Sequence, residues 1–210
     1  MDKRNLLKKA NYYYITDSDC KISVLDQVKT AVKNGVKIIQ YREKSKDDRK
    51  KYQALKKITD ICDDKALLIV NDRTDLALAV GADGVHLGQD DLPPRAVSKF
   101  AKNLLIGVSS HNIKQAEEVK SLVDYLAVGP VFRTETKGDT SPELGVERAK
   151  VIADSVDIPT AAIGGIKKDD LETLSESFDM ICAISNVTRA GDLSERISYF
   201  EEKIAKVKRR

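Results

Sequence analysis

The fold is decided by one stretch near position 40, Val36-Lys37-Ile38-Ile39-Gln40-Tyr41-Arg42-Glu43-Lys44. In a strand, side chains alternate between two faces, so every second residue from Val36 to Lys44 is expected to share one face. That face is apolar where the stretch begins and cationic where it ends, at Arg42 and Lys44. A strand buried along its whole length has no reason to change in this way. A barrel strand with an anion site at its carboxyl end does.

The same strand-like pattern recurs along the chain with amphipathic, charged segments between its copies. The apolar runs are Tyr12 to Thr16, Val36 to Gln40, Leu67 to Asn71, Gly84 to Leu87, Leu104 to Val108, Tyr125 to Val128, Thr160 to Ile163 and Met180 to Ile184. Alternating strands and helices indicate parallel pairing with right-handed crossovers. We therefore predict an α/β protein in which residues 1–210 form a single (β/α)8 TIM barrel, the catalytic domain. An open flavodoxin-like sheet would leave about three of these strands unexplained.

Composition limits the class of protein. The chain has 210 residues, 41% of them hydrophobic, and a net charge of +3 from intermixed acidic and basic residues, which is no nucleic-acid footprint. The longest apolar run, Ala66 to Val70, is far shorter than the roughly 18 residues of a membrane span, and no apolar signal core is visible. We expect a cytoplasmic protein with no nucleic-acid or membrane partner. The exposed barrel helices offer surfaces for a homo-oligomer, although the sequence selects no oligomeric state.

Cysteine and histidine are scarce. Cys20, Cys62 and Cys182 are odd in number and widely separated, and only two histidines are present. This pattern argues against a disulfide framework and against a zinc site. We expect buried free thiols.

Polar or glycine-rich clusters follow seven of the predicted strands, where a barrel keeps its functional residues. In strand order they are Gln40, Arg42 and Lys44; Asn71 and Asp72; Gly88-Gln89-Asp90-Asp91; Ser109-Ser110-His111; Thr134-Glu135-Thr136-Lys137; Gly164-Gly165; and Ser185-Asn186. Because the carboxyl ends of all strands meet at one mouth of a barrel, these clusters are expected to converge. Together they supply cations, hydroxyl groups, glycines and carboxylates.

Each cluster also has a simpler explanation. Arg42 and Lys44 would fit a solvated loop. Asn71-Asp72 would fit the start of a turn or a cap of the helix that follows, and Asp90-Asp91 would fit a cap of the helix that starts at Pro93-Pro94. Gly164-Gly165 would fit ordinary loop punctuation. His86, within a strand, is expected to be a core residue rather than a ligand. His111 would fit either a helix cap or the pocket wall.

The combined clusters favour a polyphosphate site with a metal ion. Mg²⁺ takes one or two carboxylates and completes its octahedron with water and phosphate oxygens, which suits Asp72 and Asp91. Arg42, Lys44 and Lys137 would supply positive charge for a leaving diphosphate. The segment that carries Lys137, between the sixth strand and a helix near Gly145, is long for a compact barrel and is expected to close on bound ligand.

The ordered motifs resemble those of the thiamine phosphate synthase family from about Tyr12 to Leu193. They are Gln40-Tyr41-Arg42-Glu43-Lys44, Val70-Asn71-Asp72-Arg73, Gly84-Val85-His86-Leu87-Gly88-Gln89-Asp90-Asp91, Gly107-Val108-Ser109, Gly129-Pro130-Val131-Phe132, Thr134-Glu135-Thr136-Lys137, Ile163-Gly164-Gly165-Ile166 and Ile184-Ser185. The set is specific because its members occur together and in order, whereas no single member would be.

The resemblance implies a transferase that joins 4-amino-2-methyl-5-(diphosphooxymethyl)pyrimidine to 4-methyl-5-(2-phosphoethyl)thiazole, giving thiamine monophosphate and diphosphate. It implies catalytic roles for Arg42, Lys44, Ser109 and Lys137. It further implies that Gln40, Arg42, Lys44, Asn71, Ser109 and Lys137 hold the pyrimidine diphosphate, that Asp72 and Asp91 bind Mg²⁺, and that Thr134, Thr136, Gly165, Ile184 and Ser185 face the thiazole phosphate.

The chain departs from the family pattern near the thiazole-phosphate end. Arg133 stands where proline is common, Ser177-Phe178-Asp179-Met180 replaces a segment that often carries glycines, and Asn186-Val187 is unusual after Ser185. Two other functions are compatible with the fold. One is a related thiazole tautomerase, which would not need the metal carboxylates with Arg42 and Lys44. The other is a non-catalytic sensor or carrier of a phosphorylated metabolite.

Overall fold

The computed structural model describes residues 2–134, 142–189 and 191–209. Eight parallel strands pair in sequence order. They are β1 Tyr13–Ile15, β2 Ile38–Tyr41, β3 Leu67–Asn71, β4 Gly84–Leu87, β5 Leu105–Ser110, β6 Tyr125–Val128, β7 Thr160–Ile163 and β8 Met180–Cys182. A parallel bridge between Tyr12 and Ile181 joins the last strand to the first. The strands thus form a barrel, which confirms the predicted (β/α)8 fold.

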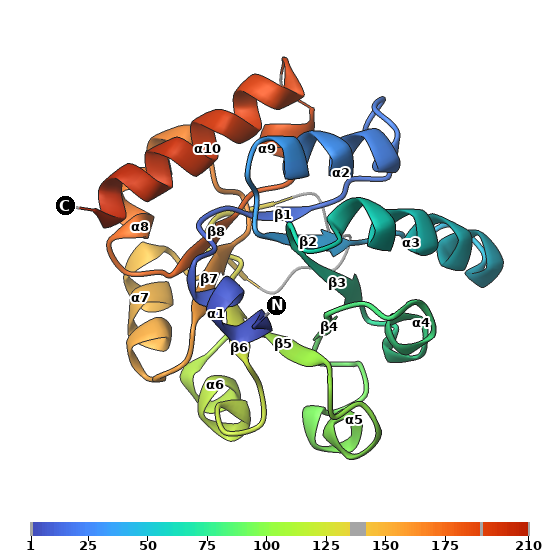
Figure 1. Ribbon diagram of the computed structural model, residues 1–210. Coiled ribbons are helices and arrows are strands. Elements are labelled where there is room, and N and C mark those ends of the chain that lie inside the picture. Colours follow the sequence, from blue (N-terminus) through green and yellow to red (C-terminus); the bar gives the residue numbers. More distant parts are fainter. Residues whose placement is uncertain (1, 135–141, 190, 210) are drawn as a thin grey trace.

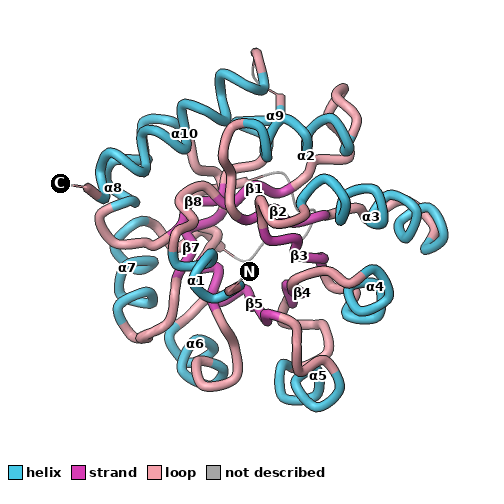
Figure 2. The backbone as a smooth tube through the Cα atoms, viewed as in Figure 1, coloured by secondary structure: helices cyan, strands magenta, loops and turns pink. Residues whose placement is uncertain are grey.

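Helices surround the strands (Figures 1 and 2). They are α1 Lys3–Lys8, α2 Val24–Lys33, α3 Asp48–Cys62, α4 Thr74–Val80, α5 Pro94–Phe100, α6 Ile113–Val119, α7 Val146–Asp154, the 3₁₀ turn η1 Lys168–Asp170, α8 Leu171–Ser175, α9 Ser185–Thr188 and α10 Leu193–Lys208. Several begin where a polar side chain accepts a hydrogen bond from the first turn, as Ser23 does for α2 and Asp192 for α10.

The barrel has two apolar layers because alternate strand residues point to opposite faces. The inner layer fills the barrel and includes Tyr13, Ile38 and Tyr125, whereas the outer layer packs the sheet against the helices and includes Tyr12 and Val36. The prediction for the opening stretch is therefore right for Ile38 and wrong for Val36. Val36 precedes the first residue of β2, so the alternation of that strand does not extend to it.

The carboxyl ends of two predicted strands, β5 and β8, need the largest corrections. Ser109 and Ser110 belong to β5 rather than to the loop after it, because they continue the ladder opposite Ala127 and Val128 of β6. At the other extreme, β8 ends at Cys182, since Ser185 already begins the one-turn helix α9. Both changes lie at the carboxyl ends of strands, where the site is.

Helix α1 packs against the amino end of the barrel. Leu7 of α1 and Ala10 join the inner apolar layer. Arg4 pairs with Asp124 (2.9 Å), and Lys3 with Asp83 (3.2 Å), each carboxylate standing just before a strand. Exposed pairs of this kind contribute little stability, so apolar burial is the main tie. The opposite, carboxyl end remains available for a ligand.

Glu201 of α10 is a partly buried acid near the start of β1. Its Oε2 accepts a hydrogen bond from Asn11 Nδ2 (3.3 Å), and its Oε1 is shielded from solvent with no hydrogen-bond partner among the described residues. Burial raises the pKa of Glu201 from its ordinary 4.5 to about 7, against the smaller lowering effects of Asn11, the Tyr12 backbone and Lys208. At neutral pH this carboxylate therefore costs the folded state free energy.

We expect Glu201→Gln to stabilise the protein by about 2 kcal/mol at pH 8 and to have little effect below pH 4.5. The pKa is raised in the folded state, so the wild type loses stability as pH rises through the range between the two values, and glutamine removes that loss. Urea unfolding at pH 4.5 and 8 measures the difference. The exposed neighbour Glu202→Gln serves as the control, and an effect of Glu201→Gln that does not change with pH would contradict the expectation.

Candidate functional site

The carboxyl ends of the strands surround one cavity of about 780 Å³. Most of the predicted site residues that the structure describes line it. They are Arg42, Lys44, Asn71, Asp72, Asp91, Ser109, Thr134, Gly165, Ile184 and Ser185. Thr136 and Lys137, with the other residues of 135–141 in the segment expected to close on ligand, lie outside the described residues. Gln40 is described but does not line the cavity.

One wall of the cavity is cationic. Arg42 and Lys44 follow β2 and both line the cavity, and neither forms an ion pair with a described residue. Glu43 stands between them in the chain, yet its carboxylate pairs with Lys46 (2.7 Å) and accepts hydrogen bonds from the backbone and hydroxyl of Ser45. The two cations are thus left with uncompensated charge, which is what an anionic ligand requires.

Glu43 remains ionised despite its burial. Burial alone would raise its pKa, but the hydrogen bonds from Lys46 and Ser45 outweigh that effect and lower the pKa to about 2. Its carboxylate therefore contacts Lys46 and Ser45 of the loop and does not neutralise Arg42 or Lys44. This contact explains how the acidic residue of the motif can lie beside two ligand-facing cations.

The neighbouring wall, after β3 and β4, carries carboxylates and an amide. Asn71 ends β3, Asp72 follows it, and Asp91 follows β4. Asp72 has a left-handed backbone (φ 62°), which is uncommon outside glycine and costs free energy that functional sites often carry. Asp91 Oδ2 accepts a hydrogen bond from the Gly88 backbone (2.6 Å), which fixes the carboxylate at the end of its strand.

The simpler explanation of these acids as helix caps is wrong. Helix α4 has Arg73 at its N-cap and α5 has Pro93, and neither helix has a side-chain cap hydrogen bond. Asp72 and Asp91 are therefore not used to begin the helices after them.

The floor of the cavity is a chain of buried hydrogen bonds that crosses the barrel. Gln40 Nε2 donates to Tyr13 Oη (2.7 Å), which bonds to Tyr125 Oη (2.7 Å). Tyr125 in turn contacts His86 Nδ1 (3.1 Å), and His86 Nε2 contacts Ser109 Oγ (3.0 Å). Gln40 thus lies beneath the cavity rather than on its wall. Its amide is part of the support under Ser109.

The two histidines differ in their use. His86 lies within β4 and is buried, as predicted for a core residue, but it also lines the cavity. His111 lines the cavity and its Nδ1 contacts the carbonyl of Gly129. The cap of α6 is Asn112 instead. Of the two earlier explanations for His111, the pocket wall is therefore the right one.

Backbone conformation explains the glycines after β7. Gly164 and Gly165 have φ values of 102° and 65°, a region that side chains rarely adopt. A Cβ on Gly164 would overlap Pro130, and one on Gly165 would overlap the backbone of Arg133 and the side chain of Phe132. The two glycines expose backbone to the cavity, so they do more than allow the chain to turn after β7.

The sequence analysis missed several residues of the cavity wall. They include Ser18, Asp19 and Gln115, with apolar neighbours. Ser18 and Asp19 had a visible signal, because the polar run from Thr16 to Asp19 follows β1, the one strand to which no cluster was assigned. Gln115 had none, since it stands inside a helix.

The cysteines are free thiols, as expected. Cys62 and Cys182 are buried, whereas Cys20 is only partly buried, which corrects that part of the prediction. Within the described ranges no group of three or more His, Cys, Asp or Glu side chains is arranged to hold a metal ion by itself.

A barrel that presents cations, carboxylates and bare backbone at the carboxyl ends of its strands is typical of enzymes that act on phosphorylated substrates. Comparison with known proteins narrows this class. The profile of the family described as thiamine monophosphate synthase matches residues 12–187. A thiamine-phosphate synthase of Methanosarcina barkeri is 36% identical over 99% of this chain and 96% of its own length. Another, of Archaeoglobus fulgidus, is 41% identical over 86% of each chain.

A solved structure agrees with these sequences. Thiamine phosphate pyrophosphorylase from Pyrococcus furiosus superposes with a TM-score of 0.89 at 35% identity, covering 97% of this chain and 99% of its own. The chain belongs to the thiamine monophosphate synthase family, which confirms the resemblance and the transferase class. In the described part of the chain, no helix is both long enough and apolar enough to cross a membrane.

Proposed function

We propose that the protein joins 4-amino-2-methyl-5-(diphosphooxymethyl)pyrimidine to 4-methyl-5-(2-phosphoethyl)thiazole and releases diphosphate. The observation that carries the proposal is the cavity itself, with Arg42 and Lys44, which form no ion pair with a described residue, on one wall and Asp72 and Asp91 on another. A leaving diphosphate needs both kinds of group, the cations directly and the carboxylates through a metal ion. Lys137 is proposed to add to the cationic side.

The reaction needs charge stabilisation more than proton transfer. The methylene C–O bond of the pyrimidine breaks, and the diphosphate leaves with the bonding electrons. The lone pair of the thiazole nitrogen then forms the new C–N bond. This nitrogen carries no proton, so no general base is required. Arg42, Lys44, Asn71 and Ser109 would hold the pyrimidine diphosphate and stabilise the departing charge by position.

Magnesium fits the residues present. Asp72 and Asp91 supply two carboxylates at the ends of adjacent strands, and Asp91 Oδ1 forms no hydrogen bond with a described residue. One or two carboxylates with water and phosphate oxygens form the usual magnesium shell. When bound, the ion would neutralise charge on the diphosphate. Asp72 and Asp91 would hold it against the anion.

The thiazole phosphate is assigned to the other end of the cavity. Gly165, Ile184 and Ser185 line that end, and Thr134 stands on the loop after β6. Bare backbone at Gly165 would allow close approach of phosphate oxygens. The family departure at Asn186 has a local role, because its Nδ2 donates to the carbonyl of Ile166 (2.8 Å) and ties α9 to the β7 loop.

Incubation with both substrates and magnesium tests the proposal. Diphosphate release that requires the thiazole phosphate, with formation of thiamine monophosphate, would support it. Isomerisation of a thiazole substrate without diphosphate release would indicate a tautomerase. Binding of phosphorylated ligands with no product would indicate a sensor or carrier. A cytoplasmic location and a homo-oligomer stay predictions from the sequence.

Ser185→Ala is expected to raise the KM for the thiazole phosphate about tenfold and to change the KM for the pyrimidine diphosphate little. The loss of one hydrogen bond to a charged group is worth about 1.5 kcal/mol, which is about this factor. Steady-state kinetics with each substrate varied in turn measures the split. Ser198→Ala, on the exposed side of α10, is the control. Equal changes in both KM values would refute the assignment of the two substrates to different ends of the cavity.

A further inference from the structure

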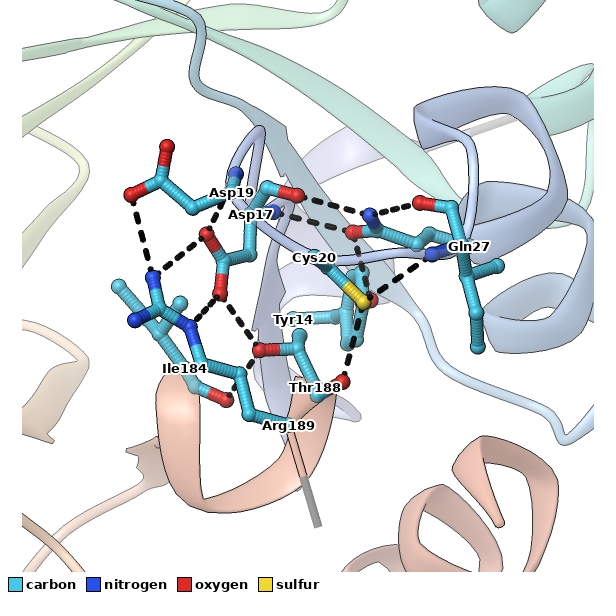
Figure 3. A network of polar contacts seen from close by, with 9 residues as sticks. Tyr14, Asp17, Asp19, Cys20, Gln27, Ile184, Thr188 and Arg189 are labelled. Atoms are coloured by element: carbon cyan, nitrogen blue, oxygen red, sulfur yellow. Dashed lines mark hydrogen bonds and ion pairs between the residues drawn. The ribbon is translucent and has the colours of Figure 1, made fainter. Parts of the chain in front are cut away.

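An ion-pair network joins the first and last loops at the mouth of the barrel (Figure 3). Asp17, after β1, is 5% exposed, and Arg189, after α9, binds its carboxylate through two nitrogens on one edge of the guanidinium group. Nε donates to Oδ2 (2.8 Å) and Nη2 to Oδ1 (3.1 Å). Thr188 Oγ1 adds a third hydrogen bond to Oδ2 (2.8 Å), and Asp19 N a fourth to Oδ1 (3.1 Å). Two-point contacts of this kind fix orientation as well as distance.

Asp17 is itself held from the barrel side. Gln27 of α2 is fully buried, and its side chain bonds to both backbone groups of Asp17, accepting from N (3.0 Å) and donating to O (2.8 Å). The Tyr14 hydroxyl donates to the same Gln27 oxygen (3.1 Å). The backbone of Asp17 is therefore held in place independently of Arg189. In the ion pair, Asp17 is the fixed partner and the α9 turn is the segment that the pair holds.

Asp17 binds the helical turn α9, whose first residues line the cavity. Helix α9 is a single turn, Ser185–Thr188, in which Arg189 N bonds to Ser185 O (3.0 Å) and Thr188 N to Ile184 O (2.9 Å). Ile184 and Ser185 line the cavity, whereas Thr188 and Arg189 make the contacts with Asp17. Because one turn separates the two ends, a shift at Arg189 is transmitted to Ser185.

We propose that Asp17 and Arg189 are positioning residues that hold Ile184 and Ser185 in place for the phosphate group of the second substrate. This inference rests on the proposed function of the cavity. Asn186 holds the same turn from the other side through Ile166, so α9 is tied to the loops of both neighbouring strands, β1 and β7. Without the Asp17 contact, α9 keeps the β7 tie, the bond from Cys20 Sγ to the Thr188 carbonyl (3.0 Å) and the exposed contact of Arg189 with Asp19 (3.2 Å), but it loses its two-point ion pair.

Asp17 is charged at neutral pH, so its ion pair with Arg189 is present under ordinary conditions. Burial alone would raise the pKa of Asp17, but the hydrogen bonds from Arg189 and Thr188 outweigh it and keep the pKa below its ordinary value. The acid is therefore ionised at neutral pH. Asp19, 78% exposed, bonds to the outer edge of Arg189 (3.2 Å) and adds little.

Arg189→Gln removes the two-point contact and tests the proposal in the complete protein. We expect the KM for the thiazole phosphate to rise about tenfold or more, with kcat within about threefold and the KM for the pyrimidine diphosphate within about twofold, because small displacements of a binding group are costly. Arg189→Lys keeps the positive charge but cannot make the two-point contact. Its KM for the thiazole phosphate should lie between those of the wild type and Arg189→Gln.

Hydrogen exchange of the backbone amides in residues 184–189 supplies a second measurement that needs no activity. It should speed up in Arg189→Gln and in Asp17→Asn. Arg4→Gln is the matched control, because Arg4 makes a similar Nε contact with Asp124 at the opposite end of the barrel. Equal losses for both substrates, or unchanged exchange in 184–189, would overturn the proposal. A wild type that forms no product would overturn the proposed function instead, while the exchange result would still decide whether the contact holds the turn.

Discussion

Replacing Asp72 or Asp91 with asparagine is expected to lower magnesium-dependent turnover by about 2–4 kcal/mol of transition-state stabilisation, or about 30- to 900-fold. Each change keeps the shape of the side chain and removes the charge that would hold the metal ion against the diphosphate. Folding should be spared, since asparagine tolerates the left-handed backbone that Asp72 adopts. Initial rates over a range of magnesium concentrations, with unfolding curves for each variant, measure both effects.

Asp64→Asn is a matched control for this experiment. Asp64 also has a left-handed backbone (φ 52°), but it lies between α3 and β3, at the amino end of the barrel. Its replacement should leave turnover unchanged. A variant that lacks both Asp72 and Asp91 and still turns over near the wild-type rate at limiting magnesium would show that these carboxylates do not bind the ion.

The positions of the strands were predictable because each is a short apolar run followed by polar residues. Leu67–Asn71 and Tyr125–Val128 agree with the structure at both ends. In β5 the error arose because two polar residues, Ser109 and Ser110, continue the ladder. Hydrophobicity cannot reveal such an extension, since hydrogen bonding to a neighbouring strand decides it.

The cavity wall was predictable for a related reason. In a parallel barrel all carboxyl ends meet at one mouth, so residues such as Asn71 and Ser185 converge whatever their separation in the chain. The direction of a side chain is harder to predict. Gln40 belongs to the same motif as Arg42, yet its amide bonds to Tyr13 beneath the cavity, because it still lies within β2 and points into the barrel.

Contacts between distant residues were not predictable from patterns. Asp17 and Arg189 are far apart in sequence, and neither stands in a recognisable motif. Their pairing follows from closure of the barrel, which brings the loop after β1 beside the turn after β8. The sequence contains both charges, but it does not show that one of them is buried.

Gly107, in the barrel core, is another residue whose role depends on a contact that the sequence pattern does not predict. It pairs with Tyr125 across β5 and β6, and the Tyr125 ring occupies the space that a side chain at 107 would need. Tyr125 is fully buried, and its hydroxyl bonds to Tyr13 (2.7 Å) and His86 (3.1 Å). The glycine therefore makes room for the central link of the chain that supports Ser109.

We expect Gly107→Ala to destabilise the protein by about 3 kcal/mol, because the new methyl group would overlap a ring that its two hydrogen bonds hold in place. Urea unfolding gives the free energy. Gly81→Ala is the control, since Gly81 has open space around it and should show only the left-handed backbone cost of about 1 kcal/mol. Tyr125→Leu removes the ring, so the double variant with Gly107→Ala should lose at least about 1 kcal/mol less than the sum of the single changes. Additive losses would mean that Gly107 is needed for another reason than the space it leaves to Tyr125.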